Sequence, residues 1–239
     1  MRILETESLT KNFGGLAAVS EVDFHIDAGE IVGLIGPNGA GKTTLFNLIS
    51  GSLSPSSGKT QFNEHDITGK RPYKICKLGI ARTFQLVQLF GHLTVRENVQ
   101  LGSLFGMFGH SKWSEADEKS SELLEFVGLL DSENALAKDM TIANQKRLEV
   151  ARALATRPEL LLLDEVMAGL NPTEVSEAIE LVRRIRDKGI TIFMIEHVMK
   201  AIMGISDRII VLHYGLKIAE GTPAEIAAHE KVIEIYLGT

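Results

Sequence analysis

The sequence has little of what several protein classes require. It contains a single cysteine, Cys76, so no disulfide can form within the chain, which suits a reducing compartment such as the cytoplasm. No stretch approaches the roughly 20 consecutive apolar residues of a membrane-spanning helix. The first residues also lack the apolar core of a signal peptide. We therefore expect any membrane role of this chain to come through a partner.

An excess of positive charge is also missing. The 239 residues carry a formal net charge of −6 and the pI is about 5.7, whereas nucleic-acid-binding domains are usually basic. With 44% hydrophobic and 23% charged residues, the composition is that of an ordinary globular protein. The length suits one large domain or two small ones. The charge therefore argues against nucleic acid as a partner.

Hydrophobic patterning divides the chain into three parts. The first third carries strand patterns, including alternation over residues 19–26, and the middle is helical, beginning with a capping box at residues 94–97. The last third alternates strands and helices. Its expected strands cover residues 160–164, 191–196 and 208–212. Such alternation predicts a mainly parallel sheet with helices on its faces.

A glycine-rich loop connects a short apolar strand to a helix expected over residues 42–49. The loop fits the pattern G-x-x-x-x-G-K-[ST] and consists of Gly36, Pro37, Asn38, Gly39, Ala40, Gly41, Lys42 and Thr43. In this pattern backbone amides and the helix N-terminus face a phosphate. The lysine, Lys42, reaches the β- and γ-phosphates, and the Thr43 hydroxyl binds Mg²⁺. Thr44 would add a hydroxyl near the α-phosphate. A glycine-rich turn that binds nothing is the alternative, which the strand–loop–helix context disfavours.

Two carboxylates follow an apolar run at residues 160–163. After a phosphate loop, Asp164 is expected to hold Mg²⁺ through water, and Glu165 to orient or deprotonate the attacking water. Taken alone, the same pattern also fits a buried strand that runs into an acidic turn.

These motifs, in this order, resemble the ATP-binding cassette (ABC) family from end to end. The resemblance implies an α/β fold: a P-loop NTPase core with a mainly parallel sheet, an N-terminal antiparallel β subdomain and an inserted helical subdomain. It implies one ABC ATPase domain over residues 1–239. The core would cover about residues 1–90 and 157–239, and the helical subdomain about residues 91–156.

Further landmarks rest on the same resemblance. Gln85 looks like the glutamine of the Q-loop, which would contact Mg²⁺ and the water and respond to a permease; an ordinary exposed glutamine is the alternative. His197 looks like the switch histidine that contacts the γ-phosphate, unless it is only a polar residue at a helix start. Phe13 matches the aromatic residue that stacks on adenine, although a buried phenylalanine fits as well. Residues 168–171 occupy the D-loop position, where two subunits meet, or simply cap a helix.

The sequence departs from the family at its LSGGQ signature, which in the family closes over ATP held by the opposite subunit. Residues 140–144 align with it: Thr141 keeps a hydroxyl that would reach a γ-phosphate, but Ala143 replaces the second glycine. A Cβ there would obstruct backbone approach to phosphate, or strain the chain if the position needs a positive φ. The departure therefore calls into question the ATP site that this signature would complete on the opposite subunit. It also favours a working pair made of two different chains.

Four segments resemble the importers of branched-chain and other hydrophobic amino acids, and they are residues 82–85, 89–99, 168–172 and 236–238. The resemblance implies an ATPase at the cytoplasmic face of the inner (cell) membrane. Its partners would be a second ABC ATPase subunit, identical or different, transmembrane permease subunits and, indirectly, a solute-binding protein. The cofactors would be ATP and Mg²⁺.

Other functions stay open at this stage. The ATPase of a lipid or lipopolysaccharide exporter shares much of the cassette. A soluble ABC ATPase acting on nucleic acid or ribosomes is disfavoured by the acidic charge and the single cassette. A small P-loop kinase or GTPase would leave Gln85 and His197 unexplained, and the chain has no N-K-x-D guanine-reading motif.

Overall fold

The computed structural model describes residues 1–106 and 113–237, so Gly238, the last residue of the importer-like C-terminal segment, lies outside the described residues. The strands are β1 (Arg2–Phe13), β2 (Leu16–Asp27), β3 (Ile31–Ile35), β4 (Ser57–Phe62), β5 (His65–Asp66), β6 (Ile80–Arg82), β7 (Leu160–Asp164), β8 (Thr191–Ile195), β9 (Arg208–His213) and β10 (Leu216–Gly221). The α-helices are α1 (Lys42–Ile49), α2 (Pro72–Leu78), α3 (Val95–Phe105), α4 (Trp113–Val127), α5 (Ile142–Ala155), α6 (Pro172–Asp187), α7 (Met199–Ile205), α8 (Pro223–Ala227) and α9 (Glu230–Leu237). Short 3₁₀ helices cover Leu130–Ser132 and Ala137–Asp139.

Two sheets form the framework. The larger has the order β10-β9-β3-β8-β7-β6, in which all strands from β9 to β6 run parallel and only β10 is antiparallel. The smaller is antiparallel, with the order β2-β1-β4-β5. Every residue of β3, β7 and β8 is buried, which explains their apolar composition. The expected fold class, including the antiparallel β sheet and the inserted helices, is confirmed.

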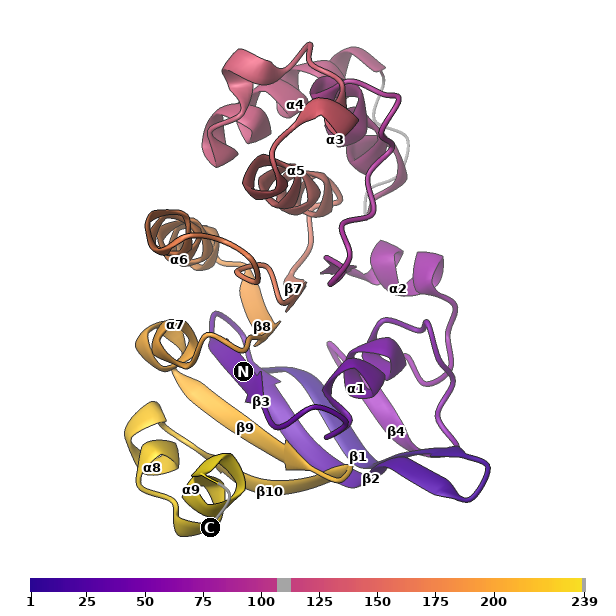
Figure 1. Ribbon diagram of the computed structural model, residues 1–239. Helices are drawn as coiled ribbons and strands as arrows, with labels where there is room; N and C mark the ends of the chain where they lie inside the picture. Colours follow the sequence, from indigo (N-terminus) through magenta and orange to yellow (C-terminus); the bar gives the residue numbers. More distant parts are fainter. Residues whose placement is uncertain (107–112, 238–239) are drawn as a thin grey trace.

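Helix α1 lies in the layer between the two sheets (Figure 1). There Phe193 of β8 contacts Phe46 of α1, with ring centroids 4.9 Å apart, and Phe24 of β2, with centroids 5.5 Å apart. A second core covers the opposite face of the large sheet and includes side chains of α5, α6 and α7. A third core joins α3, α4 and α5, which stand together at the far end of the molecule in Figure 1.

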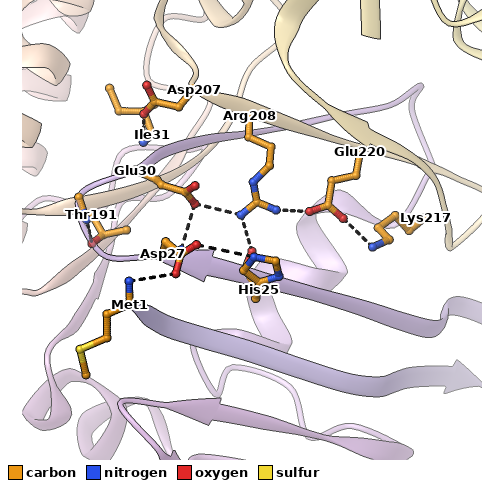
Figure 2. Close-up of polar contacts among 11 residues, drawn as sticks. Met1, His25, Asp27, Glu30, Ile31, Thr191, Asp207, Arg208, Lys217 and Glu220 are labelled. Atoms are coloured by element: carbon orange, nitrogen blue, oxygen red, sulfur yellow. Dashed lines mark hydrogen bonds and ion pairs between the residues drawn. The ribbon is translucent and has the colours of Figure 1, made fainter. Parts of the chain in front are cut away.

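An ion-pair network around Arg208 fastens the two sheets at the amino-terminal ends of the parallel strands (Figure 2). The Arg208 guanidinium donates to the His25 carbonyl at 2.7 Å and to Glu30 at 2.9 Å, and it also pairs with Glu220. His25 belongs to the antiparallel sheet, whereas Arg208 and Glu220 belong to the large sheet. The network therefore fixes how one sheet sits on the other.

The expected local elements are largely present. The helix over residues 42–49 is confirmed, and so is the capping box that opens α3, where Thr94 and Glu97 bond to each other's backbone. The strand expected at residues 191–196 ends one residue early, at Ile195, and the Glu196 side chain accepts a hydrogen bond from the Met167 amide. The described helices include none with the length and apolar character needed to cross a bilayer.

Candidate functional site

The site lies at one edge of the large sheet. Strands β3, β8 and β7 are parallel neighbours, so the segments that follow them emerge side by side. The glycine-rich loop follows β3, Glu165 follows β7, and His197 comes just after β8. Parallel pairing of β6 with β7 brings Gln85 to the same edge. Sheet topology thus gathers four segments that are far apart in the sequence.

These segments surround a cavity of about 230 Å³. Its lining consists of Ala18, Asn38, Gly39, Ala40, Gly41, Lys42, Thr43, Thr44, Gln85, Glu165 and His197. Most of the predicted phosphate-loop residues therefore share one cavity with the predicted catalytic residues. The predicted site residues that do not line it are Phe13, Gly36, Pro37, Thr141, Ala143 and Asp164.

Two glycines of the loop are required by its shape. Gly41 has φ +104°, a value unfavourable for side-chain-bearing residues, and a Cβ there would overlap the Ala18 carbonyl. A Cβ at Gly36 would overlap the Leu212 carbonyl. One side of the loop backbone therefore lies directly against neighbouring backbone. The cavity is lined by residues of the same loop.

Lys42 points back over the loop. Its Nζ donates to the Gly36 carbonyl at 2.6 Å and to the Pro37 carbonyl at 3.0 Å. Burial lowers the pKa of Lys42, and the nearby carboxylates of Glu165 and Asp164 oppose that shift. An ammonium with three donors and flexible carbons can exchange these carbonyls for phosphate oxygens.

Glu165 is only 8% exposed, and its carboxylate is held from two sides. His197 Nε2 lies 2.7 Å from Oε1, and Gln85 Nε2 donates to Oε2 at 2.9 Å. Its backbone has a left-handed φ of +53°, which costs roughly 1–2 kcal/mol for a residue with a Cβ. Such strain is concentrated at functional sites.

Asp164 is fully buried and paired with Arg82. The Arg82 guanidinium donates to Asp164 Oδ2 at 2.7 Å and to the Asn47 amide oxygen at 2.6 Å. Burial raises the pKa of Asp164, and the hydrogen bond and charge of Arg82 oppose the shift. The other oxygen, Oδ1, has no hydrogen-bond partner among the described residues. This oxygen therefore keeps its capacity to accept a hydrogen bond or to hold a cation.

Local sequence patterns assign no role to three charged residues near the site, and these are Arg82, Lys146 and Glu196. Lys146 Nζ donates to the Glu165 carbonyl at 2.9 Å. Glu196 Oε1 accepts from the Met167 amide at 2.8 Å. The available signal was a charged residue, Glu196, at the end of an otherwise apolar strand pattern over residues 191–195.

Three further predicted site residues, Phe13, Thr141 and Ala143, lie outside the cavity. Phe13 is 48% exposed at the end of β1, with the Lys11 ammonium 5.2 Å from its ring centroid. Thr141 caps α5, and its hydroxyl accepts the Asn144 N–H at 3.3 Å. Ala143 lies in the first turn of that helix and is not among the residues with positive φ. The condition for backbone strain at Ala143, a positive φ, is therefore not met, because a helical position accepts a Cβ.

Comparison with known proteins gives family matches over most of the chain. The profile of the family described as "ABC transporter" matches residues 19–168, and that of "Branched-chain amino acid ATP-binding cassette transporter" matches residues 217–239. The chain is 42% identical to the "High-affinity branched-chain amino acid transport ATP-binding protein LivG" of Salmonella typhimurium. The alignment covers 99% of this chain and 98% of that protein.

Solved structures agree. An ATP-binding cassette of an ABC transporter in its ADP conformation superposes with a TM-score of 0.90 at 34% identity, over 100% of both chains. A cassette whose structure is described as a dimeric post-hydrolysis state bound to ADP and Pi has a TM-score of 0.84 at 25% identity, over 92% of this chain and 99% of the other.

Proposed function

Because this chain belongs to the ABC transporter family, as one of its ATP-binding, ATP-hydrolysing subunits, we propose that it powers an importer of branched-chain or other hydrophobic amino acids. The C-terminal match at residues 217–239 and the 42% identity to LivG over nearly the whole chain support this substrate class. The transported solute would contact a permease and a binding protein, not this subunit.

The hydrolytic part of the proposal rests on the arrangement of side chains around Glu165. The Glu165 carboxylate, between His197 and Gln85, lines the same cavity as Lys42. We assign Glu165 as the group that orients and deprotonates water for attack on the γ-phosphate of ATP. Lys42 and His197 would stabilise the charge on the transferring phosphoryl group, so that ATP and water yield ADP and inorganic phosphate.

A magnesium ion fits the residues present. The partnerless Oδ1 of buried Asp164 is a hard oxygen donor of the kind that Mg²⁺ prefers, and Thr43 and Gln85 line the cavity beside Glu165. We assign these three residues to the ion, with Asp164 acting through water. When bound, the ion would neutralise charge on the β- and γ-phosphates. Phe13, exposed at the end of β1, is assigned to adenine stacking.

A second ATPase subunit would complete the site. The start of α5 offers a surface for it, since Thr141 is exposed and Ile142 is 64% exposed. We propose that residues 140–144, with Thr141 and Ala143, close over the nucleotide of that subunit. The degenerate signature favours a partner of different sequence.

A permease would dock on a second surface next to the Q-loop segment, separate from the nucleotide cavity. A groove of about 330 Å³ lies between α2, α3 and α5 and is lined mostly by apolar side chains. Phe84, Phe90 and Phe105 line it and are 40%, 52% and 70% exposed. We propose that this groove, beside the helical subdomain at about residues 91–156, receives a permease helix at the cytoplasmic face of the cell membrane.

The decisive experiment uses the transporter reconstituted in vesicles with its permease and binding protein. ATP hydrolysis should rise when binding protein loaded with leucine is added, and Glu165→Gln should abolish hydrolysis while ATP still binds. A glutamate on the exposed face of α6 gives the control, Glu177→Gln. If the rate of ATP hydrolysis does not change when leucine, valine or phenylalanine is supplied, the substrate class is rejected. If Glu165→Gln keeps full activity, the assigned mechanism is rejected.

A further inference from the structure

Lys146 connects helix α5 to the loop that carries Glu165. It lies in the second turn of α5 and is only 9% exposed. Its Nζ donates to the Glu165 carbonyl at 2.9 Å and to the Ala168 carbonyl at 2.7 Å. One ammonium group thus bonds both ends of the turn that follows β7.

The turn needs outside support, because Glu165 has a left-handed backbone with φ +53°. A strained conformation persists only where neighbouring groups over-determine it. The Glu165 N–H donates to the Ile195 carbonyl at 2.9 Å, and the Met167 N–H donates to Glu196 Oε1 at 2.8 Å. With the two bonds from Lys146, every residue of the turn except Val166 has a backbone group held from another element.

The charges around Lys146 suit this task. Burial lowers the pKa of Lys146, and the carboxylates of Glu196, Glu165 and Glu149 oppose the shift. An ammonium carries three donors and no acceptor, so two carbonyls together with a nearby carboxylate are well matched to it. An apolar side chain of similar length would leave the Ala168 carbonyl without this donor and the Glu165 carbonyl with only the Ala168 N–H, 3.2 Å away.

We propose that Lys146 is a positioning residue for ATP hydrolysis, tying α5 to the backbone of Glu165 and Ala168. The inference rests on the role proposed above for Glu165. The N-terminal end of α5 carries the cap Thr141 and, in its first turn, Ala143, both assigned to the nucleotide of the partner subunit. Through Lys146, displacement of this helix moves the general base of the chain's own site, so each site responds to the nucleotide held in the other.

The test compares Lys146→Met and Lys146→Arg in the assembled transporter, by steady-state ATP hydrolysis. In Lys146→Met, kcat should fall about 10- to 100-fold, the scale of a small misplacement of a catalytic group, while KM for ATP stays unchanged. Lys146→Arg should recover most of the rate, since a guanidinium can also donate to two carbonyls. Arg147→Met is the matched control: it removes the next cation of α5, which pairs with Glu177, and should leave kcat unchanged.

Hydrogen exchange of the isolated chain gives a readout independent of turnover. In Lys146→Met the amides of residues 165–169 should exchange faster, with exchange in α1 and in the phosphate loop unchanged. Wild-type kcat in Lys146→Met, an equal loss in Lys146→Arg, or a parallel rise in KM would each overturn the inference. Its failure is distinguishable from failure of the proposed function, because Glu165→Gln tests that function without touching Lys146.

Discussion

His197 Nε2 and Glu165 Oε1 lie 2.7 Å apart, although 32 residues separate them in the chain. They follow the neighbouring parallel strands β8 and β7, whose pairing brings their ends together. Gln85 bonds the other oxygen, Oε2. Each carboxylate oxygen keeps a second lone pair, so the two contacts orient Glu165 while leaving it able to accept a hydrogen bond from water.

Removing the histidine tests this arrangement. In His197→Ala, kcat for ATP hydrolysis should fall by about 10²-fold or more, the usual effect of losing a positioned polar group at a transferring centre, whereas ATP affinity measured by calorimetry should change little. The exposed His92 supplies a control, His92→Ala, which should keep full activity. A variant that loses ATP affinity and turnover together would show that His197 serves mainly in nucleotide binding.

A methyl group at Gly41 should damage the phosphate loop. In Gly41→Ala the new Cβ would overlap the Ala18 carbonyl at a backbone φ of +104°, so the loop must move. We expect at least about 1 kcal/mol loss in the free energy of unfolding and a large loss of ATP affinity, measured by denaturant titration and calorimetry. Gly15→Ala is the matched control, since no atom lies within 4 Å of its added Cβ and its φ is not positive. Unchanged ATP binding by Gly41→Ala would contradict the required close approach.

Glu196 should make stability depend on pH. Burial raises its pKa from 4.5 to about 7, with the Met167 amide and Lys146 opposing the shift. A carboxyl with a raised folded-state pKa stabilises the fold fully at pH values below its unfolded pKa. That contribution is lost as the pH rises through the folded pKa.

Wild type should therefore lose up to about 3 kcal/mol relative to Glu196→Gln between roughly pH 4.5 and pH 7.5. Denaturant unfolding of both proteins across this range measures the difference, and the variant cancels the titration of all other groups. Parallel stability curves for the two proteins would show that Glu196 has an ordinary pKa in the folded chain.

The Arg208 network should matter for stability and not for nucleotide binding. Arg208→Met removes the guanidinium from Glu30 and Glu220 (Figure 2). Among the described residues these carboxylates keep only the Asp27 N–H and Lys217 as partners, and we expect a loss of about 1–3 kcal/mol in the free energy of unfolding. The network lies at the end of the parallel strands opposite the phosphate loop, so ATP affinity well below the melting temperature should be unchanged. Weaker ATP binding in the folded variant would mean that the orientation of the two sheets affects the geometry of the nucleotide site.

Sequence alone was informative wherever the determinants are local. The phosphate loop needs glycines, a lysine and a hydroxyl within one short segment after an apolar strand, and all of these can be read in order. Asp164 and Glu165 end a four-leucine run, which marks a buried strand running to the sheet edge. The helix start at Thr94 follows from capping chemistry that spans only a few residues.

Tertiary structure decided the contacts that link distant segments. The pairing of Arg82 with Asp164 spans 82 residues, and the bond from Lys146 to the Glu165 carbonyl joins a helix to the end of a strand. Neither leaves a periodic or compositional trace, because charged residues are ordinary on helices and in strand ends. Local sequence preferences determine which elements form and which residues follow each strand. The partners of a buried charge depend on the packing of whole elements, since only packing removes the water that would otherwise solvate it.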